Sequence, residues 1–500
     1  MAVATSTYQN FIGGEWRDAS GGATFDVTNP ANGELLATFP DSTAADVDAA
    51  VRAARAAFDK WRLMPAPHRG EILFRAAEIM VERKEELARE MTREMGKVVA
   101  ETRGDVQEAI DMLYYMAGEG RRLFGEVVPS ELPDKFAMST RIPVGVVGAI
   151  TPWNFPIAIP SWKLAPALIC GNTVVFKPAH DTPISALRLV EILTEAGLPA
   201  GVVNIVFGHG AAAGEAVVAH PDVDIISFTG SSATGKVIST NAAATLKRVS
   251  LELGGKNVII LNEDADVDLA IEGIVWSAFG TSGQRCTAAS RVVVHDSIYD
   301  EVVSRVVAAA KQLQLGDGLE DGTDVGPVIN QTQLDKIMSY RAIGEADGAT
   351  LMCGGERATE GDLAKGFFYK PTVWADVKPT ARIAQEEIFG PVTAFIRASS
   401  FEDAIDIANG VEYGLSSAIY TRDVNLAFKA MRDLYTGITY INAGTIGAEI
   451  QLPFGGTRNT GNGHRDAGQA ALDMYTEWKS LYIDYSGKLQ KAQIDDVSFS

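Results

Sequence analysis

The chain is poor in cysteine, in positive charge and in uninterrupted apolar sequence. Three cysteines in 500 residues give no disulfide framework, so a reducing, cytoplasmic compartment is expected. Lys and Arg number 44 against 64 Asp and Glu, and the net charge of −20 argues against nucleic acid as a partner. The first ten residues lack the basic and apolar regions of a signal peptide, so none is expected.

The most apolar stretch, residues 144–176, is interrupted by Asn154, Lys163 and four prolines. It therefore predicts a buried strand-and-loop segment and argues against a membrane span. The hydrophobic content of 46% and the charged content of 22% are those of an ordinary soluble protein. The length predicts two or three domains with ample buried cores.

The N-terminal part of the chain has mainly helical periodicity. Residues 43–46 have the form of a capping box, and a helix is expected to follow it. Two further helices are predicted over 67–95 and 102–124. Residues 125–142 are polar and strand-like, which predicts an arm that leaves the body of the protein.

Beyond residue 144 the chain alternates between apolar strands and helices. The first series has strands at 144–150, 173–177, 204–207 and 225–229, with helices at 183–196, 212–219 and from 232. The second series has strands at 258–261 and 292–295, with helices at 269–279 and 298–313. Each series predicts a mainly parallel sheet, and the second α/β unit begins near residue 254.

Cys286 has the surroundings that best suit chemistry. It lies in residues 279–287 (FGTSGQRCT), a polar loop with glycines that let a ligand approach, which is the setting a reactive thiolate needs. Cys170 lies in an apolar run and is expected in a core, and Cys353 beside a Gly-Gly turn is interpreted as incidental. A lone cysteine is more often a small buried apolar residue, so this loop alone leaves both interpretations open.

Three further segments carry groups that suit carbonyl chemistry. Glu252 ends an apolar run, and it is either a partly desolvated general base or an acid that faces water. Asn154, within residues 152–156 (PWNFP), is either an oxyanion donor or an ordinary turn residue. Glu387 and Phe389 either hold a ribose and pack a ring, or are a solvated acid and a core side chain.

Residues 228–236 (FTGSSATGK) follow a predicted strand and open a helix. A glycine-bearing turn there presents free N–H groups and the positive end of the helix dipole, which suits a phosphate. Val237 stands where a mononucleotide P-loop has its magnesium-binding hydroxyl, so that motif is not matched. A purely structural turn is the alternative.

These groups are mutually compatible: a thiol nucleophile, a base, an oxyanion donor, a phosphate-binding turn and a ribose-binding acid. Together they indicate oxidation of a carbonyl compound through a covalent thioester, with a dinucleotide as hydride acceptor. Two alternatives come from other classes: a cysteine hydrolase that uses Cys286 with His464, and a nucleotide-binding module without chemistry. The sequence indicates no metal site.

Over nearly its whole length the chain resembles the aldehyde dehydrogenase superfamily. The motifs that carry the resemblance are residues 152–156, 177–179 (KPA), 228–231, 252–256 (ELGGK), 283–286 (GQRC), 386–391 and 453–456 (PFGG). The resemblance implies an α/β fold in three parts. They are a Rossmann-like cofactor domain (1–124 and 143–253), an α/β catalytic domain (254–477) and a small β oligomerisation arm (125–142 and 478–500). It further implies a homo-oligomer, either a dimer or a tetramer.

The resemblance also implies roles for single residues. Cys286 would attack the aldehyde, Asn154 would steady the oxyanion, and Glu252 would activate the water that hydrolyses the thioester, with Lys163 nearby. The presence of Glu252 favours this hydrolytic branch over the coenzyme-A-acylating branch. The implied cofactor contacts are Trp153, Lys177, Ala179, His180, Gly210, Gly214, Phe228, Thr229, Gly230, Ser231, Gly235, Leu253, Glu387 and Phe389.

Residues 114–120, 159–163 and 447–453 resemble the branch that oxidises 2-oxoglutarate semialdehyde (2,5-dioxovalerate), and a broad-specificity aldehyde dehydrogenase is the alternative. A carboxylate-bearing aldehyde requires a cation, for which Arg285 is the candidate unless it turns outward into a salt bridge. Many NAD-preferring relatives have a Glu where this chain has His180, and that Glu would repel a 2′-phosphate. His180 therefore favours NADP, or the use of both NADP and NAD.

Overall fold

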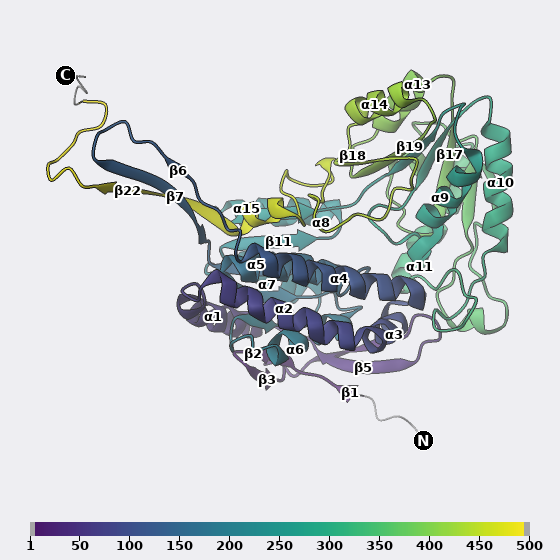
Figure 1. The fold of residues 1–500 in the computed structure, drawn as a ribbon. Helices are drawn as coiled ribbons and strands as arrows, with labels where there is room; N and C mark the ends of the chain where they lie inside the picture. Colours follow the sequence, from purple (N-terminus) through teal and green to yellow (C-terminus); the bar gives the residue numbers. More distant parts are fainter. Residues whose placement is uncertain (1–5, 495–500) are drawn as a thin grey trace.

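Two seven-stranded sheets, each mainly parallel, organise the chain. The computed structural model describes residues 6–494, so the outermost parts of the predicted terminal segments, 1–5 and 495–500, lie outside the described residues. Figure 1 shows the two sheets side by side in the body, with a long β arm projecting from it. The predicted α/β fold class is confirmed.

The first sheet combines five parallel strands with an N-terminal hairpin. Its order is β12 (Arg248–Glu252), β11 (Ile225–Thr229), β8 (Val146–Ile150), β9 (Thr173–Lys177), β10 (Val203–Ile205), β2 (Asn10–Ile12) and β3 (Glu15–Arg17). Residues 146–150 alternate between the two faces, with Val147 and Ala149 in one core cluster and Val146 and Ile150 in another. Both faces of the sheet are buried, so the sequences of these strands are almost continuously apolar.

Helices cover both faces of this sheet. The elements are α1 (Ala44–Trp61), α2 (Ala66–Glu82), α3 (Lys84–Met95), α4 (Val99–Glu119), α5 (Ala158–Cys170), α6 (Pro183–Glu195), a π-helical turn (Gly210–Gly214), α7 (Glu215–Ala219) and α8 (Ser232–Ala243). The predicted capping box at Thr43 is present at the start of α1.

Two helix predictions were wrong in extent, and one helix was not predicted. The helix predicted over 67–95 is two helices, because the chain turns at Arg83 between α2 and α3. The helix predicted over 102–124 begins and ends earlier, as α4. The segment predicted as strand and loop contains α5, which is buried on nearly every side and carries Pro166 inside it. A helix buried all round shows no apolar stripe, so its periodicity is invisible.

The second sheet has the same size and a separate pair of cores. Its order is β15 (Thr350–Cys353), β16 (Thr372–Ala375), β17 (Val392–Ala398), β14 (Arg291–His295), β13 (Val258–Leu261), β19 (Ser416–Tyr420) and β20 (Ile438–Ile441). Its helices are α9 (Val267–Phe279), α10 (Tyr299–Gln312), α11 (Gln331–Ala346), α12 (Arg382–Gln385), α13 (Phe401–Asn409) and α14 (Val424–Asp433).

The arm joins two segments that lie far apart in the sequence. Strand β22 (Thr476–Asp484) pairs along its whole length with β7 (Lys135–Pro143), and β6 (Val127–Val128) completes the sheet. The smaller elements are β1 (Ser6–Thr7), β4 (Thr24–Thr28), β5 (Leu35–Pro40), β18 (Tyr413–Gly414), β21 (Thr457–Arg458) and α15 (Leu472–Tyr475), with 3₁₀ turns at Gly280–Gly283, Gly361–Lys365 and Gln469–Ala471.

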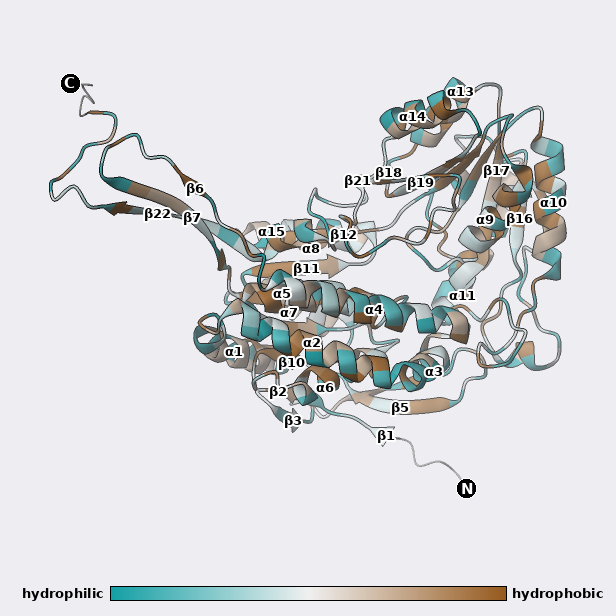
Figure 2. Ribbon diagram, in the orientation of Figure 1, coloured by the Kyte–Doolittle hydropathy of each residue, from teal (hydrophilic) through white to brown (hydrophobic). Residues whose placement is uncertain are grey.

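The colouring of Figure 2 shows the inner strands of both sheets as largely hydrophobic, with polar residues on the outer sides of the helices. Cys170 is buried in the first core, as predicted. Within residues 6–494, no helix is long and apolar enough to cross a membrane.

Candidate active site

Cys286 follows a loop held in an unusual backbone conformation. After α9 the chain passes through Thr281 (φ 53°), Ser282 (φ 53°) and Gly283 (φ 68°), three consecutive residues in the left-handed region. A Cβ on Gly283 would lie 2.0 Å from the carbonyl oxygen of Gly390, so only glycine fits there. Such strain persists only where surrounding contacts fix it, and it is typical of functional sites.

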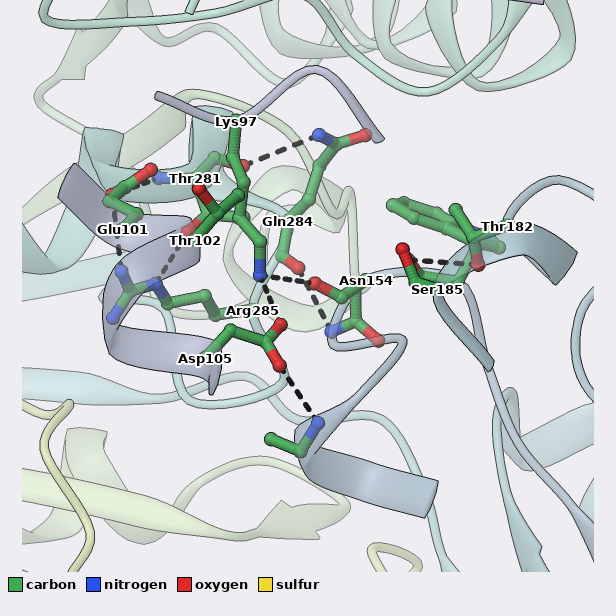
Figure 3. A network of polar contacts seen from close by, with 12 residues as sticks. Lys97, Glu101, Thr102, Asp105, Asn154, Thr182, Ser185, Thr281, Gln284 and Arg285 are labelled. Atoms are coloured by element: carbon green, nitrogen blue, oxygen red, sulfur yellow. Dashed lines mark hydrogen bonds and ion pairs between the residues drawn. The ribbon is translucent and has the colours of Figure 1, made fainter. Parts of the chain in front are cut away.

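A buried polar network fixes this loop (Figure 3). Glu101 of α4 accepts a hydrogen bond from the Thr281 N–H (2.7 Å) and forms an ion pair with Arg285 (3.1 Å). Lys97 forms a fully buried ion pair with Asp105 (2.7 Å) and donates to the backbone oxygen of Asn154 (2.9 Å). The charges satisfy one another, so the network positions the loop without leaving a buried charge unpaired.

The network also places Asn154 beside the nucleophile loop. Its side-chain Nδ2 donates to the backbone oxygen of Gln284 (3.0 Å), two residues before Cys286. Asn154 and Cys286 line the same cavity. An amide nitrogen carries two hydrogens, so Nδ2 keeps a second donor for an oxyanion.

Cys286 and Glu252 line one cavity of about 130 Å³. The carboxylate of Glu252 ends β12, is buried, and within residues 6–494 neither of its oxygens has a hydrogen-bond partner. Burial, and then the charge of Asp466, raises the pKa of Glu252 well above its usual value. A buried acid without partners is costly for folding, and a raised pKa suits a general base.

The surroundings of Cys286 differ from the expected thiolate-favouring setting. Burial, followed by the carboxylates of Glu252, Glu387 and Glu108, raises the pKa of the Cys286 thiol to about 12. The thiol therefore keeps its proton at neutral pH in this state. Attack on a substrate requires a base to take that proton, and Glu252 lines the same cavity.

A second cavity, of about 180 Å³, meets the first at Cys286. Its lining includes Trp153, Thr229, Ser231, Lys336, Glu387 and Phe389. The rings of Trp153 and Phe389 contact edge to face at 5.4 Å, and Phe389 has a positive φ of 61°. Glu387 accepts from the Gly255 N–H (3.0 Å), and burial raises its pKa.

A third cavity, of about 450 Å³, lies between the π-helical turn and α8. Gly210, Gly214 and Phe228 line it, and a Cβ added at either glycine would meet no atom of the described residues within 4 Å. Ser231 caps the N-terminus of α8 by accepting from Thr234 N–H. A dinucleotide suits this arrangement. Its two ends fit the open third cavity and the cavity that reaches the thiol, and its pyrophosphate fits the helix N-terminus.

The remaining predicted cofactor residues take different positions. Lys177 is buried at the end of β9, and burial lowers its pKa to about 8. Ala179 and His180 follow in the next turn, half-buried. Gly230 and Leu253 line the second cavity. Gly235 lines none of the three described cavities and packs against Leu253, where a Cβ would come within 2.5 Å of the leucine Cδ2.

Lys163 and Arg285 both belong to ion pairs. The buried Lys163 contacts Asp466 (2.9 Å), which lines the Cys286 cavity. Arg285 also lines this cavity, yet its guanidinium pairs with the buried Glu101 and lies 5.0 Å from the centre of the Trp276 ring. It is therefore turned neither fully outward nor fully toward the thiol.

Some cavity residues carried no signal in the sequence. Glu108 of α4 lines the Cys286 cavity, and burial, then the charge of Asp105, raises its pKa to about 8. Lys336 and Gln333 of α11 line the second cavity.

His464, the base required by the hydrolase alternative, is absent from the described lining of the Cys286 cavity. Residues 6–494 contain no group of three or more His, Cys, Asp or Glu suited to a metal ion.

Comparison with known proteins agrees with this site. The model of the aldehyde dehydrogenase family matches residues 16–481. The alpha-ketoglutaric semialdehyde dehydrogenase of Bacillus subtilis is 42% identical, over 97% of this chain and 100% of that protein. The alpha-ketoglutarate semialdehyde dehydrogenase of Haloferax volcanii is also 42% identical, over 96% of this chain and 100% of its own length.

Among solved structures, a betaine aldehyde dehydrogenase from Staphylococcus aureus in complex with NAD⁺ superposes with a TM-score of 0.94. It is 36% identical, and the match covers 96% of this chain and 95% of that chain. The family model matches most of the chain, and relatives with this identity are matched over their full length. The chain belongs to the aldehyde dehydrogenase family, a family of NAD(P)-dependent oxidoreductases.

Proposed function

We propose that this enzyme oxidises a small carboxylate-bearing semialdehyde, such as 2-oxoglutarate semialdehyde, to the acid through a thioester on Cys286. The observation that carries the proposal is the position of the thiol. Cys286 belongs to two cavities at once, one with an unpartnered Glu252 among the described residues and one with Glu387 and Phe389. A substrate and a hydride acceptor can therefore meet at one sulfur atom.

Each step of the proposed reaction depends on particular residues. The Cys286 sulfur adds to the aldehyde carbon, and the thiol proton passes to water, either directly or through Glu252, which is then free to act again. Asn154 Nδ2 and the backbone N–H of Cys286 stabilise the oxyanion. A nicotinamide cofactor held by the residues of the second cavity would supply the hydride acceptor, and loss of the hydride would leave a thioester on Cys286. Glu252 then removes a proton from the water that attacks the thioester, and the acid departs as the thiol reforms.

For the cofactor, Phe389 and Trp153 would enclose the nicotinamide end, and Glu387 and Lys177 would hold the two riboses. Ser231 and the N-terminus of α8 would hold the pyrophosphate, and the cavity beside Gly210 would take the adenine. His180 in place of a carboxylate supports NADP, or both NADP and NAD, because a carboxylate there would repel a 2′-phosphate.

Arg285 is the proposed partner of the substrate carboxylate. Its pairing with Glu101 neutralises part of its charge but holds the guanidinium at the cavity wall. Glu108 in the same wall does not oppose a substrate carboxylate at neutral pH, because burial raises its pKa to about 8. Two relatives named for this semialdehyde support the same substrate.

The test is the rate of reduced-cofactor formation with NAD⁺ and NADP⁺. The aldehydes are 2-oxoglutarate semialdehyde, succinate semialdehyde, an uncharged aliphatic aldehyde and benzaldehyde. The proposal expects the highest kcat/KM with the first. It expects Arg285→Leu to lower kcat/KM for the two charged aldehydes at least about tenfold more than for the uncharged ones.

Arg122→Leu is the matched control, because Arg122 also pairs with a buried glutamate of α4, Glu119, and does not line the Cys286 cavity. It should leave the preference among aldehydes unchanged. Equal rates for charged and uncharged aldehydes would favour a broad-specificity enzyme. No turnover with any aldehyde and either cofactor would overturn the dehydrogenase activity itself.

We further propose that the first sheet forms the cofactor domain, the second sheet the catalytic domain, and the arm an oligomerisation surface. The arm exposes several apolar side chains: Val127, Phe136, Trp478, Tyr482 and Ile483. Exposed apolar strands of this kind are usually covered by a partner. Light scattering should give a multiple of the 53.4 kDa chain mass, and Ile483→Asp should lower it.

A further inference from the structure

A buried asparagine holds the backbone of Cys286 from the second sheet. Asn257 lies directly before β13 and is almost inaccessible to solvent. Its side-chain Nδ2 donates to the backbone oxygens of Cys286 (2.7 Å) and Ala288 (2.9 Å). Its Oδ1 accepts from the backbone N–H of Ser416 (3.0 Å), the first residue of β19. One amide therefore ties the residue that carries the thiol to two strands of the second sheet.

The donors of this amide are fully used. An asparagine nitrogen has two hydrogens, and both are directed at carbonyl oxygens of the nucleophile loop. In the part of the chain that the structure describes, no other hydrogen bond reaches the Cys286 oxygen. The peptide group after Cys286 and the Cys286 side chain share one Cα atom. A turn of that peptide group therefore moves the sulfur.

Asn257 also belongs to the segment that carries the proposed base. Residues 252–257 connect the end of β12 in the first sheet to the start of β13 in the second, with Glu252 at one end and Asn257 at the other. A Cβ on Gly255, within this segment, would lie 2.8 Å from the Cys286 oxygen. The segment thus packs directly on the nucleophile loop, and it links the base to the amide that holds the thiol residue.

We propose that Asn257 is a positioning residue that directs the Cys286 thiol into the cavity shared with Glu252. Asn257 lines neither of the two cavities that contain Cys286, so it acts through the Cys286 carbonyl and not on the substrate. Addition of the sulfur to an aldehyde carbon requires the two atoms to be close and aligned, and a displacement of about 1 Å can lower the rate about 10²-fold. The inference rests on the proposed role of Cys286 as the nucleophile.

The test separates kcat from KM, with the aldehyde that gives the highest kcat/KM and with NAD⁺. Asn257→Ala should lower kcat, and the rate of the first turnover in rapid mixing, about 10²-fold. The KM for the aldehyde and the Kd of NAD⁺ should change less than about threefold, because no group of the cavity wall is removed. Asn257→Ser, whose hydroxyl is one bond shorter than the amide, is a milder second variant and should show the same separation.

Asn204→Ala is the matched control. Asn204 is buried in β10, and its Nδ2 also donates to two backbone oxygens, those of Gly201 (2.8 Å) and Val174 (3.5 Å). Its Oδ1 likewise accepts from one backbone N–H, that of Gly13 (2.8 Å). Asn204 lines none of the three cavities of the candidate site. Both alanine variants should lower the urea midpoint, but only Asn257→Ala should lower kcat per folded enzyme.

The outcomes distinguish this inference from the proposed function. A kcat within about threefold of the wild type in both Asn257 variants overturns the inference. An equal loss of kcat in Asn204→Ala assigns the effect to general destabilisation and overturns it as well. Cys286→Ser tests the proposed function separately: wild-type turnover in that variant would show that Cys286 is not the nucleophile. If Cys286→Ser is inactive while both Asn257 variants are fully active, only the role of Asn257 fails.

Discussion

Two buried glutamates in this protein show how the same residue type serves structure in one region and chemistry in another. Glu94, on α3, and Glu252, on β12, are both almost inaccessible to solvent. Burial raises the pKa of Glu94 to about 8 and that of Glu252 well above its usual value. Their partners differ completely.

Glu94 accepts from the backbone N–H groups of Ile184 and Ser185 and from the Ser185 hydroxyl (2.6 Å). It thereby caps α6, whose own N-cap residue Thr182 makes no side-chain capping bond. Glu94 is thus compensated by contacts that join α3 to α6.

Glu252 has no such compensation, because neither oxygen has a partner among the described residues. An uncompensated buried acid lowers stability, and it persists where its function depends on it. We therefore expect Glu94 to serve stability and Glu252 to serve proton transfer.

The largest expected effect is that of Glu252→Gln on turnover. A glutamine cannot take a proton from water, so hydrolysis of the thioester should slow by about 10²–10⁴-fold. Rapid mixing should show a burst of reduced cofactor, close to one per active site, followed by this slow rate. Glu94→Gln, a buried acid changed in the same way, is the control and should turn over normally. A Glu252→Gln enzyme with a wild-type steady-state rate would break the comparison.

Glu94→Ala should have a large effect on stability and little on catalysis. It leaves three donors at the start of α6 without their acceptor, which should cost about 2–3 kcal/mol of unfolding free energy. Urea unfolding measures this change, and kcat per folded enzyme should be that of the wild type. Wild-type stability in Glu94→Ala would mean that α6 is capped by other groups.

Per pH unit, the pH dependence of stability is the smallest of these effects. The folded pKa of Glu94 is about 8 against an unfolded value of 4.5, so between these values the folded state binds more protons than the unfolded state. Stability from this group is fully present below the unfolded pKa and falls as pH rises toward the folded pKa. Compared with the wild type, Glu94→Gln should therefore show a shallower fall, by about 1 kcal/mol per pH unit.

Urea midpoints measured from about pH 5 to about pH 8 provide this slope. A slope that is the same in both proteins would show that Glu94 is ionised throughout. Glu252→Gln should flatten the curve as well, since burial raises its pKa in the same direction.

Local pattern predicted the parallel strands up to residue 295 well, but β16, β17, β19 and β20 of the second sheet were not identified. Strands β9, β11 and β13 have the predicted bounds, because short apolar runs ended by polar residues or glycine have few alternatives. Helix α5 was missed, since its prolines and its burial on all sides hide the helical period. The break at Arg83 was missed for the opposite reason: the helical pattern continues across it.

The residues of the candidate site also differ in whether the sequence alone makes them visible. Cys286, Glu252 and Asn154 stand beside glycines and prolines, whose backbone requirements make them visible in the sequence. Glu108 and Glu101 are ordinary helix acids in α4, and only the packing of α4 against the Cys286 loop places them at the cavity.

The sequence by itself determined the α/β class, many of the strands and the residue types that can perform the chemistry, because these depend on local periodicity and on motifs of a few residues. Tertiary structure alone decided which charges meet. It paired Arg285 with Glu101, left Glu252 without a partner among the described residues, and brought the rings of His180 and His209 together at a tilt. The physical reason is that solvation and partner distance set the energy of a charge, and both depend on segments far apart in the chain.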